Sequence, residues 1–482
     1  MVLGCWLACF SVSADPPKLD FLFPAGGPLG ETISVEAGSK LEPWPVDVWT
    51  DHPDLVFKAG EKKGVFEVAI GVDVPPGPHL VRVMNSNGVS NVKWFVVGLD
   101  PELREVEDND RWEDAQVVSN FPVVVNGGFA ERGAVDCFAV DIPSNQTLVV
   151  NMNAYGIDAG VDAMMYVLDA QGHRIAHVHD SRRLDPHLHF RPEAPGRYIV
   201  QLAGFVHPPS ADVRFHGGAG VRYRLRFALI ADGQEKPLAS MIANGVDEPE
   251  RLQFPMKVIG RIETPREEDL FAFEVKKGEH LVFTPIAMSV GSPLDPYLSI
   301  RDEEDRVLAK VDDTKSAQKD APLEWTATKE GPMRLGIRDA LYRHGPAYTY
   351  RIQVEAGRPG IRASTETDVL VIEAGKAAQL KLQVSRRFGD AGAWIAVAHE
   401  LPKGVKVSAA ELDAKGGELT LDFQADEKTP PGNTAIKLSV ASLDPDRPEV
   451  APVAVRLKGL STPHEDVYPN TVEQVWLTVK AP

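Results

Sequence analysis

The segment RYRLRFAL, residues 222–229, carries the pattern that decides the fold of this chain. Apolar side chains at 223, 225, 227 and 229 alternate with arginines at 222, 224 and 226. Successive side chains of a β-strand point to opposite faces, so a period of two predicts a half-buried antiparallel strand. The arginine face predicts a row of charge on an edge strand that blocks aggregation, and docking of an acidic partner is the alternative.

The same alternation recurs along the chain, for example in residues 148–152 and 198–202. Glycine, proline, asparagine and aspartate interrupt these runs at close intervals, as turns between strands require. No long segment shows the 3.6-residue period of an amphipathic helix. The sequence therefore predicts an all-β chain, organised as a series of β-sandwiches.

An internal repeat divides the middle of the chain. Asp136-Cys-Phe-Ala-Val matches Asp269-Leu-Phe-Ala-Phe, and this offset of 133 residues holds without a gap over 45 residues. It pairs the aspartates at 162, 169 and 180 with those at 295, 302 and 313, and after small gaps Asp185 pairs with Asp320. A period this long indicates tandem copies of one domain rather than a solenoid.

The repeat and its flanks predict four β domains joined by short linkers. Their expected ranges are 15–98 for the N-terminal domain, 99–232 and 233–356 for the two copies, and 357–482 for the C-terminal domain. Residues 1–14, MVLGCWLACFSVSA, are apolar and end in small residues, which predicts a secretory signal peptide cleaved after Ala14. A lipoprotein signal at Cys9 is the alternative, and the segment is too short to span a bilayer.

Charge and cysteine content exclude several classes of protein. The 482 residues carry a formal net charge of −18, which argues against a nucleic-acid binder and against adsorption to anionic membranes. Without the signal peptide, Cys137 is the one cysteine left, so no intramolecular disulfide can form and packing must supply the stability. Cys137 is expected to act as a small buried hydrophobe.

Residues 105–116 (EVEDNDRWEDAQ), 135–146 (VDCFAVDIPSNQ) and 161–180 (VDAMMYVLDAQGHRIAHVHD) together resemble the bacterial pre-peptidase C-terminal (PPC) domain. The second copy resembles the same domain through residues 267–279 and 293–313. The resemblance implies jelly-roll-like β-sandwiches of the kind that accompany secreted peptidases, glycosidases and large surface proteins. The flanking segments 21–35 and 386–407 resemble the Ig-like modules of such proteins in planctomycete-type bacteria.

The resemblance also implies a calcium site in the first copy. Calcium takes six to eight oxygen ligands, and collagenase-type PPC domains hold it with an acidic linker that precedes the Asp-x-Phe strand. Carried over by position, the implied ligands are Glu105, Glu107, Asn109, Asp110 and Asp136. Gly133 departs from the pattern of this family, because a second aspartate at that position would help to bind calcium. A solvated acidic linker with a turn at Asn109 and Asp110 is the alternative.

The second copy is a poorer candidate for calcium. Its acidic segment, residues 247–250, lies closer to the matching Asp269, and Arg266 stands where the first copy has Gly133. A cation at that position opposes metal binding, so no calcium is expected there.

Histidines gather in the first copy, where seven of the thirteen lie between residues 173 and 216. The pairs His177/His179 and His187/His189 would each project from one strand face, a pattern that suits zinc, copper or nickel. However, the repeat pairs residue 177 with a lysine and 179 with an aspartate. These positions therefore tolerate charge, and an exposed, pH-sensitive patch is the favoured interpretation.

Known catalytic signatures are absent from the sequence, including GxSxG, HExxH, the phosphate-binding loop and the Rossmann glycine pattern. We therefore expect a secreted, non-enzymatic binding or scaffold protein of the cell envelope, in the periplasm or at the cell surface. Its expected partner is an extracellular polymer or an envelope protein. An accessory subunit, or a divergent relative, of a secreted peptidase is the alternative. Its ligand and its oligomeric state stay open at this level.

Overall fold

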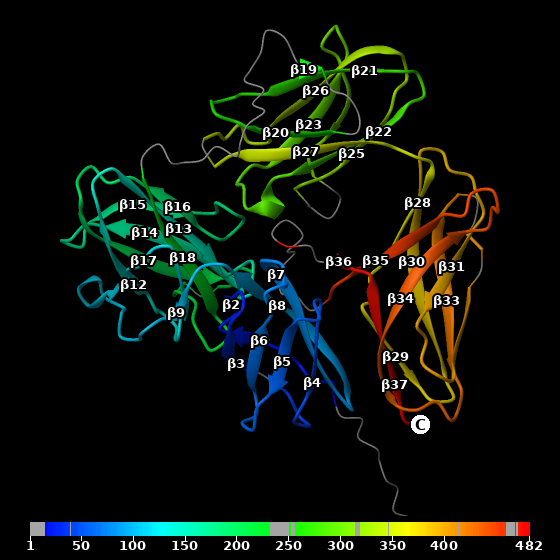
Figure 1. Cartoon of the computed structure of the whole chain (residues 1–482), viewed down its shortest axis with the longest axis horizontal. Helices are drawn as coiled ribbons and strands as arrows, with labels where there is room; N and C mark the ends of the chain where they lie inside the picture. The colour runs from blue at the N-terminus through cyan, green and yellow to red at the C-terminus, as the bar shows by residue number, and fades with distance from the viewer. Residues whose placement is uncertain are drawn as a thin grey trace, which may run out of the picture.

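The computed structural model describes residues 15–38, 40–211, 213–231, 250–251, 256–313, 319–345, 347–409, 411–412, 415–458, 468 and 471–482. In these residues the fold is all-β, as the alternating sequence predicts, with two single-turn 3₁₀ helices beside the strands (Figure 1). The predicted signal peptide, residues 1–14, lies outside the described part. Within the described part, no helix has the length and apolarity needed to cross a bilayer.

Two four-stranded sheets form the N-terminal sandwich, with the strand orders β1-β3-β6-β5 and β2-β8-β7-β4. Val35, Phe66, Val81 and Phe95 are among the side chains buried between them. The strands are β1 (Phe21–Phe23), β2 (Gly26–Pro28), β3 (Thr32–Gly38), β4 (Asp47–Thr50), β5 (Leu55–Ala59), β6 (Val65–Ile70), β7 (Gly77–Asn85) and β8 (Gly88–Gly98).

The two repeat copies have the same strand order. The first-copy sandwich has the sheets β10-β12-β17-β14-β15 and β16-β13-β18-β11-β9, and the second-copy sandwich has β19-β21-β26-β23-β24 and β25-β22-β27-β20. Each described strand of the second copy has a counterpart at the same place in the first. The topology therefore repeats as the sequence does.

The strands of the first copy are β9 (Glu102–Arg104), β10 (Gln116–Val117), β11 (Val123–Gly128), β12 (Asp136–Ile142), β13 (Gln146–Asn153), β14 (Val161–Leu168), β15 (Arg174–His179), β16 (His187–Phe190), β17 (Gly196–Val206) and β18 (Arg222–Ala231), with η1 (Trp112–Asp114). Those of the second are β19 (Glu250–Arg251), β20 (Met256–Arg261), β21 (Asp269–Val275), β22 (His280–Ile286), β23 (Pro296–Arg301), β24 (Val307–Val311), β25 (Leu323–Thr326), β26 (Gly331–Asp339) and β27 (Thr349–Ala356), with η2 (Met288–Val290).

One pair of repeated aspartates shows why the copies share residues. The carboxylate of Asp185 accepts hydrogen bonds from the backbone N–H groups of residues 154, 155 and 156, at 2.8 Å each. Asp320 does the same for residues 287, 288 and 289, at 3.0 Å each. Buried backbone donors must find acceptors, so both aspartates are held by the fold itself.

The C-terminal sandwich follows one continuous path, β29-β37-β34-β35-β28-β30-β33-β32, with β31 paired to β34 and β36 to β35. Alternation is plain in β30, where Leu380, Leu382 and Val384 are buried and the intervening residues are exposed. The strands are β28 (Gly360–Thr365), β29 (Val369–Glu373), β30 (Ala377–Arg387), β31 (Trp394–His399), β32 (Val405–Ala409), β33 (Gly417–Ala425), β34 (Gly432–Ser442), β35 (Val450–Arg456), β36 (Thr471–Val472) and β37 (Gln474–Lys480).

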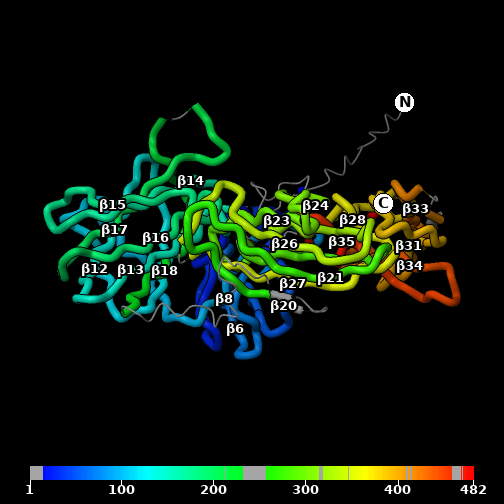
Figure 2. Tube along the Cα trace, turned by 90° about the horizontal axis from the view of Figure 1, so that it is seen from above, coloured from blue at the N-terminus to red at the C-terminus, as the bar shows by residue number. Residues whose placement is uncertain are grey.

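The N-terminal sandwich lies between the first-copy and C-terminal sandwiches, and the second copy lies above them in the view of Figure 1. Seen from above, the first-copy and C-terminal sandwiches occupy opposite ends of the molecule (Figure 2). A buried cluster joins three of the four parts. Trp94 comes from the N-terminal sandwich, Tyr155 and Ile157 from the first copy, and Leu457 and Tyr468 from the C-terminal part.

Buried ion pairs hold the same junction. Arg82 donates to Asp368 across the N-terminal and C-terminal sandwiches at 2.7 Å, with side chains only 1% and 10% exposed. The ammonium group of Lys93 contacts the carboxylate of Asp158 in the first copy, and both side chains are buried. Charges removed from water in this way must keep their partners, because an unpaired buried charge is strongly unfavourable.

The interpretation of the 222–226 arginines as an edge charge row is wrong, because β18 lies inside its sheet, between β13 and β11. Arg224 donates to both carboxylate oxygens of Glu102, at 2.6 and 2.8 Å, and both side chains are buried. The guanidinium of Arg222 lies 4.4 Å from the centre of the Phe23 ring in the N-terminal sandwich. The arginine face therefore forms an internal contact surface.

Removal of one member of the Arg82–Asp368 pair is expected to weaken the junction strongly. Asp368→Ala leaves a buried guanidinium without its counter-charge, at a cost of about 3–5 kcal/mol. Urea unfolding followed by tryptophan fluorescence should show this, since Trp49 and Trp476 line a small cavity together with Arg82.

Two controls sharpen this prediction. The double variant Arg82→Met/Asp368→Leu should recover most of the loss, because apolar packing replaces the pair without leaving a charge. Breaking the exposed Asp141–Arg197 pair with Arg197→Ala should have no measurable effect. A single Asp368→Ala variant as stable as the unmodified protein would contradict the assignment.

Candidate metal centre

A tyrosine–aspartate hydrogen bond crosses each repeat sandwich from one sheet to the other. The hydroxyl of Tyr223 in β18 donates to Asp136 Oδ2, at the start of β12, over 2.6 Å. In the second copy, Tyr350 of β27 donates to Asp269 of β21 in the same way. All four side chains are buried. This cross-sheet bond is the framework on which the predicted calcium site stands.

Two residues of the acidic linker join this pair in the first copy. Glu105 Oε1 lies 2.7 Å from the same Tyr223 hydroxyl, whose single proton can be donated to Asp136 or to Glu105 but not to both. Glu105 Oε1 also accepts from Asn109 Nδ2 at 3.1 Å. Glu105 Oε2 accepts from the backbone N–H of Gly128 at 2.9 Å. The backbone carbonyl of Asn109 also accepts from the N–H of Cys137 at 2.9 Å, which fixes the linker against β12. Glu105 and Asp136 therefore meet at one tyrosine, and Asn109 contacts the Glu105 carboxylate.

The two other residues implied as ligands lie at the rim. Glu107 and Asp110 are exposed, and both carry negative charge close enough to act on Asp136. Burial, together with the charges of Glu105, Glu107 and Asp110, raises the pKa of Asp136 to about 9. Burial also raises the pKa of Glu105, against the effect of its hydrogen bonds. The cluster has an excess of negative charge.

The composition of this cluster fits a hard divalent cation. The carboxylates of Glu105 and Asp136 and the side-chain carbonyl of Asn109 offer oxygen, which is the ligand type that calcium prefers. Asn109 is only 1% exposed, and its side-chain Oδ1 has no hydrogen-bond partner among the described residues. A buried polar atom without a partner is costly, and a cation would satisfy it. Bound calcium would also favour the ionised forms of Glu105 and Asp136.

Tyr223 and the Gly128 amide are parts of this site that the sequence analysis did not assign. A signal for the tyrosine was present, because Tyr223-Arg-Leu pairs with Tyr350-Arg-Ile in the repeat. The role of Gly128 follows from its place in β11 beside β9, which only the folded sheet reveals.

The second copy has the same tyrosine–aspartate framework. Burial raises the pKa of Asp269 to about 7, and the Tyr350 hydrogen bond opposes this rise. Arg266 is exposed and has a positive φ of 64°, as Gly133 does at 94° in the first copy. Residues 247–249 lie outside the described part of the chain, so the expected absence of calcium here stays a prediction.

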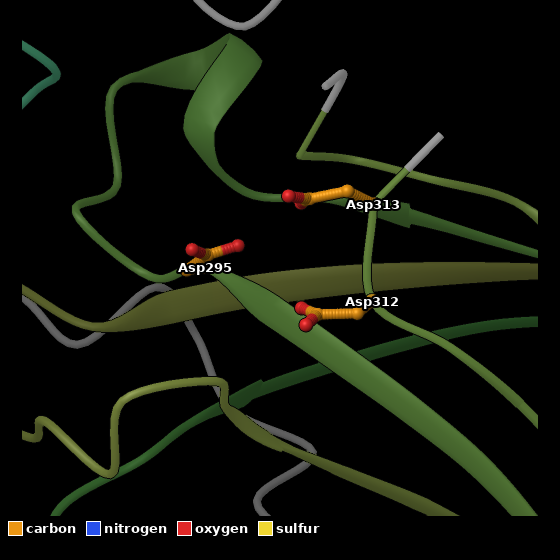
Figure 3. A group of neighbouring side chains, drawn as sticks. All are labelled: Asp295, Asp312 and Asp313. Atoms are coloured by element: carbon orange, nitrogen blue, oxygen red, sulfur yellow. The ribbon is translucent and has the colours of Figure 1, made fainter. Parts of the chain in front are cut away.

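A second acidic group lies elsewhere in the second copy. Oxygens of Asp295, which precedes β23, and of Asp312 and Asp313, which follow β24, come within 4.8 Å of one another (Figure 3). The ammonium group of Lys319 lies 3.0 Å from Asp295 and 2.8 Å from Asp313. Lys319 thus neutralises part of this charge internally, and a metal ion would have to displace it.

The histidine-rich region is only partly exposed. His177 and His179 are exposed, as predicted, and their rings are stacked 6.4 Å apart. The Nε2 atoms of His187 and His189 lie 2.6 Å apart, so one nitrogen must donate and the other accept. Burial and the charge of His189 lower the pKa of His187 to about 4. His187 is therefore neutral at physiological pH.

Cys137 is fully buried, as expected of a small hydrophobe. Burial raises the pKa of its thiol to about 11, so it is not an activated nucleophile.

Comparison with known proteins gives likeness of fold alone. No family model matches the sequence, and no curated protein matches it. The pre-peptidase C-terminal domain of collagenase from Bacillus anthracis is similar over 23% of this chain and 99% of its own, with 17% identity and a TM-score of 0.19. Fibronectin(III)-like modules of Clostridium thermocellum CbhA cover 47% of this chain and 95% of their own, with 9% identity and a TM-score of 0.13.

A third solved structure contains the M60 catalytic domain with two CBM51 domains of Clostridium perfringens ZmpB. It covers 71% of this chain and 46% of its own length, with 8% identity and a TM-score of 0.16.

Calcium is expected to stabilise the first-copy sandwich. A ligand that binds only the folded state at 100 times its dissociation constant adds about 2.7 kcal/mol. Thermal unfolding of the full chain with calcium and with excess EDTA measures this. Glu107→Ala should abolish the shift without harming the metal-free fold, since Glu107 is exposed. Glu193→Ala, at an exposed site elsewhere in the same sandwich, should keep the shift, and its loss there would contradict the assignment.

Without calcium, the first copy is expected to lose stability as the pH rises. Folded Asp136 keeps its proton up to about pH 9, whereas an unfolded aspartate releases it near about pH 3.9. Between these values the folded state binds more protons, so the free energy of unfolding falls with increasing pH. Melting temperatures in EDTA across this range should show the slope, and Asp136→Asn should flatten it. Asp141→Asn, an exposed control, should leave the slope unchanged.

Proposed function

We propose that this chain is a non-catalytic binding protein whose β-sandwiches are fixed together as one scaffold. The observation that carries the proposal is the junction of buried charge and aromatic side chains that joins the N-terminal, first-copy and C-terminal parts. Domains joined by flexible linkers would not bury such groups between them, because the contacts between independently moving domains are small and polar. A fixed arrangement presents several sandwich surfaces to one large partner at once.

The scaffold is proposed to combine two tandem PPC-type domains with flanking Ig-like domains. The shared strand order and the repeated tyrosine–aspartate bond support the relation between the two copies. The oxygen-rich cluster around Asp136 supports a structural calcium ion in the first copy only. Such an ion would stiffen the linker that enters this sandwich, because Glu105 and Asn109 belong to that linker.

The proposed setting is outside the cytoplasm, in the periplasm, at the cell surface or secreted. The apolar N-terminal segment supports export, and stability without disulfides fits the four packed cores. The proposed partner is an extracellular polymer or an envelope protein. A catalytic role is not part of the proposal, because the sequence carries none of the catalytic signatures sought and the Cys137 thiol is not activated.

Co-sedimentation tests this function directly. The purified full chain is mixed with insoluble cellulose, chitin, xylan, peptidoglycan and gelatin, and both bound protein and released soluble fragments are measured. We expect binding to at least one polymer and no release of fragments. Release that survives repurification of the protein would support the alternative of a peptidase relative or other hydrolase, and a lack of binding to any polymer would contradict the proposal.

A further inference from the structure

A groove runs between the N-terminal sandwich and the β36–β37 segment of the C-terminal part. Its volume is about 270 Å³, near the lower end of small-molecule pockets, which span roughly 300–1,000 Å³. Trp49, Asp51, Leu80 and Trp94 come from one side, and Glu473 and Gln474 come from the other. The groove exists only because the two sandwiches are docked, so neither domain carries it alone.

Two indole rings line the groove, and Trp49 is the one whose ring is accessible. Trp49 is half-buried, and its ring meets that of Trp476 edge to face, with 5.9 Å between the ring centres. Trp94 is 3% exposed and packs against Tyr468 at 5.2 Å. Both rings are therefore held by neighbours before any ligand arrives, and such fixed aromatic surfaces lose little entropy on binding.

The polar groups that line the groove include both donors and acceptors, so they favour a ligand that both accepts and donates hydrogen bonds. The indole N–H of Trp94 is buried without a partner among the described residues, and an indole N–H can only donate. The carboxylates of Asp51 and Glu473 can only accept when ionised, whereas the Gln474 amide does both. A hydroxyl group matches this set, because it donates one hydrogen bond and accepts two.

The Asp51 carboxylate is positioned by a buried histidine. Nδ1 of His79 lies 2.8 Å from Asp51 Oδ1, and its Nε2 lies 2.7 Å from the carbonyl oxygen of Pro75. Both of these partners are acceptors, so the ring donates from both nitrogens and carries a positive charge. The Asp51 side chain remains 32% exposed. It can therefore accept from a ligand while its orientation is fixed.

A small cavity adjoins the groove and shares Trp49 and Gln474 with it. Arg82 lines this cavity, and its Nε and Nη1 have no hydrogen-bond partner among the described residues. The cavity volume is about 10 Å³, which is close to the least that holds one water molecule.

The charged side chains of the groove exclude some classes of ligand. Asp51 and Glu473 disfavour an anion, and so does the net charge of −18. An ammonium ion would suit the carboxylates and the indole faces, but it has no acceptor for the Trp94 N–H. An uncharged polyhydroxylated ring has an apolar face for an indole and hydroxyl groups around its edge.

We propose that this groove binds an uncharged sugar residue, as part of a polysaccharide that enters between the two sandwiches. The inference rests on the proposed binding function and names the chemical class of its polymer. Trp49 supplies the apolar surface, Asp51 and Glu473 accept from sugar hydroxyls, and Trp94 and Gln474 donate to them.

Isothermal titration calorimetry of the full chain with cellohexaose, xylohexaose, mannohexaose and chitohexaose tests the groove, with choline as the ammonium probe. At least one oligosaccharide should bind. Trp49→Ala should weaken that binding at least about tenfold, the loss that corresponds to roughly 1.4 kcal/mol. Gln474→Ala should weaken it as well, and this variant avoids disturbing the Trp49–Trp476 contact. Trp112→Ala removes an indole that does not line the groove, so it should bind as the unmodified protein does.

The outcomes separate this inference from the proposed function. Oligosaccharide binding that survives both Trp49→Ala and Gln474→Ala would leave the binding function in place and overturn the groove assignment. Choline binding that requires Trp49, without sugar binding, would show a site for cations instead. Co-sedimentation with gelatin alone, and no oligosaccharide binding, would keep a binding protein but reject a sugar as its ligand at this site.

Discussion

Charges buried between sandwiches are the constraint on which the rest of this molecule depends. Two ion pairs, Arg82–Asp368 and Lys93–Asp158, are buried away from water. Each charge tolerates this burial only because its partner lies opposite it on another sandwich. Neither pair can separate without leaving a charge in an apolar junction. The surrounding cluster of Trp94 and its neighbours adds apolar contact, while the ion pairs fix the register in which the sandwiches meet. The groove beside β36 follows from that register.

The two repeat copies show how one fold accommodates different charge. Both keep the cross-sheet bond, Tyr223 to Asp136 and Tyr350 to Asp269, and both keep the aspartate that receives three backbone amides. Around this shared framework the first copy gathers carboxylates beside the linker. At a different place in the second copy, Lys319 lies among the clustered aspartates Asp295 and Asp313. The framework is kept because the backbone requires it, whereas the surrounding charges are free to change.

The linker between the N-terminal sandwich and the first copy carries residues of both the ion-pair network and the predicted calcium cluster. Glu105 and Asn109 form part of the predicted calcium cluster, and Glu102, three residues earlier, pairs with Arg224 on β18. The segment that leaves the N-terminal sandwich is thus bound twice to the first copy. An ion at the cluster would add to contacts that already hold this segment against β11 and β18. The proposed metal centre and the proposed scaffold are therefore linked through one short stretch of chain.

The sequence by itself determined the all-β fold and the repeat, because a period of two and a constant offset are properties of the chain alone. The resemblance to PPC domains, carried by that sequence, implied one site for Glu105, Glu107, Asn109, Asp110 and Asp136. Tertiary structure alone decided how the arginines of β18 are used, since alternation shows that a face is polar but not what covers it. Tertiary structure also formed the groove, because Trp49 and Gln474 are far apart in sequence and meet only when two sandwiches dock.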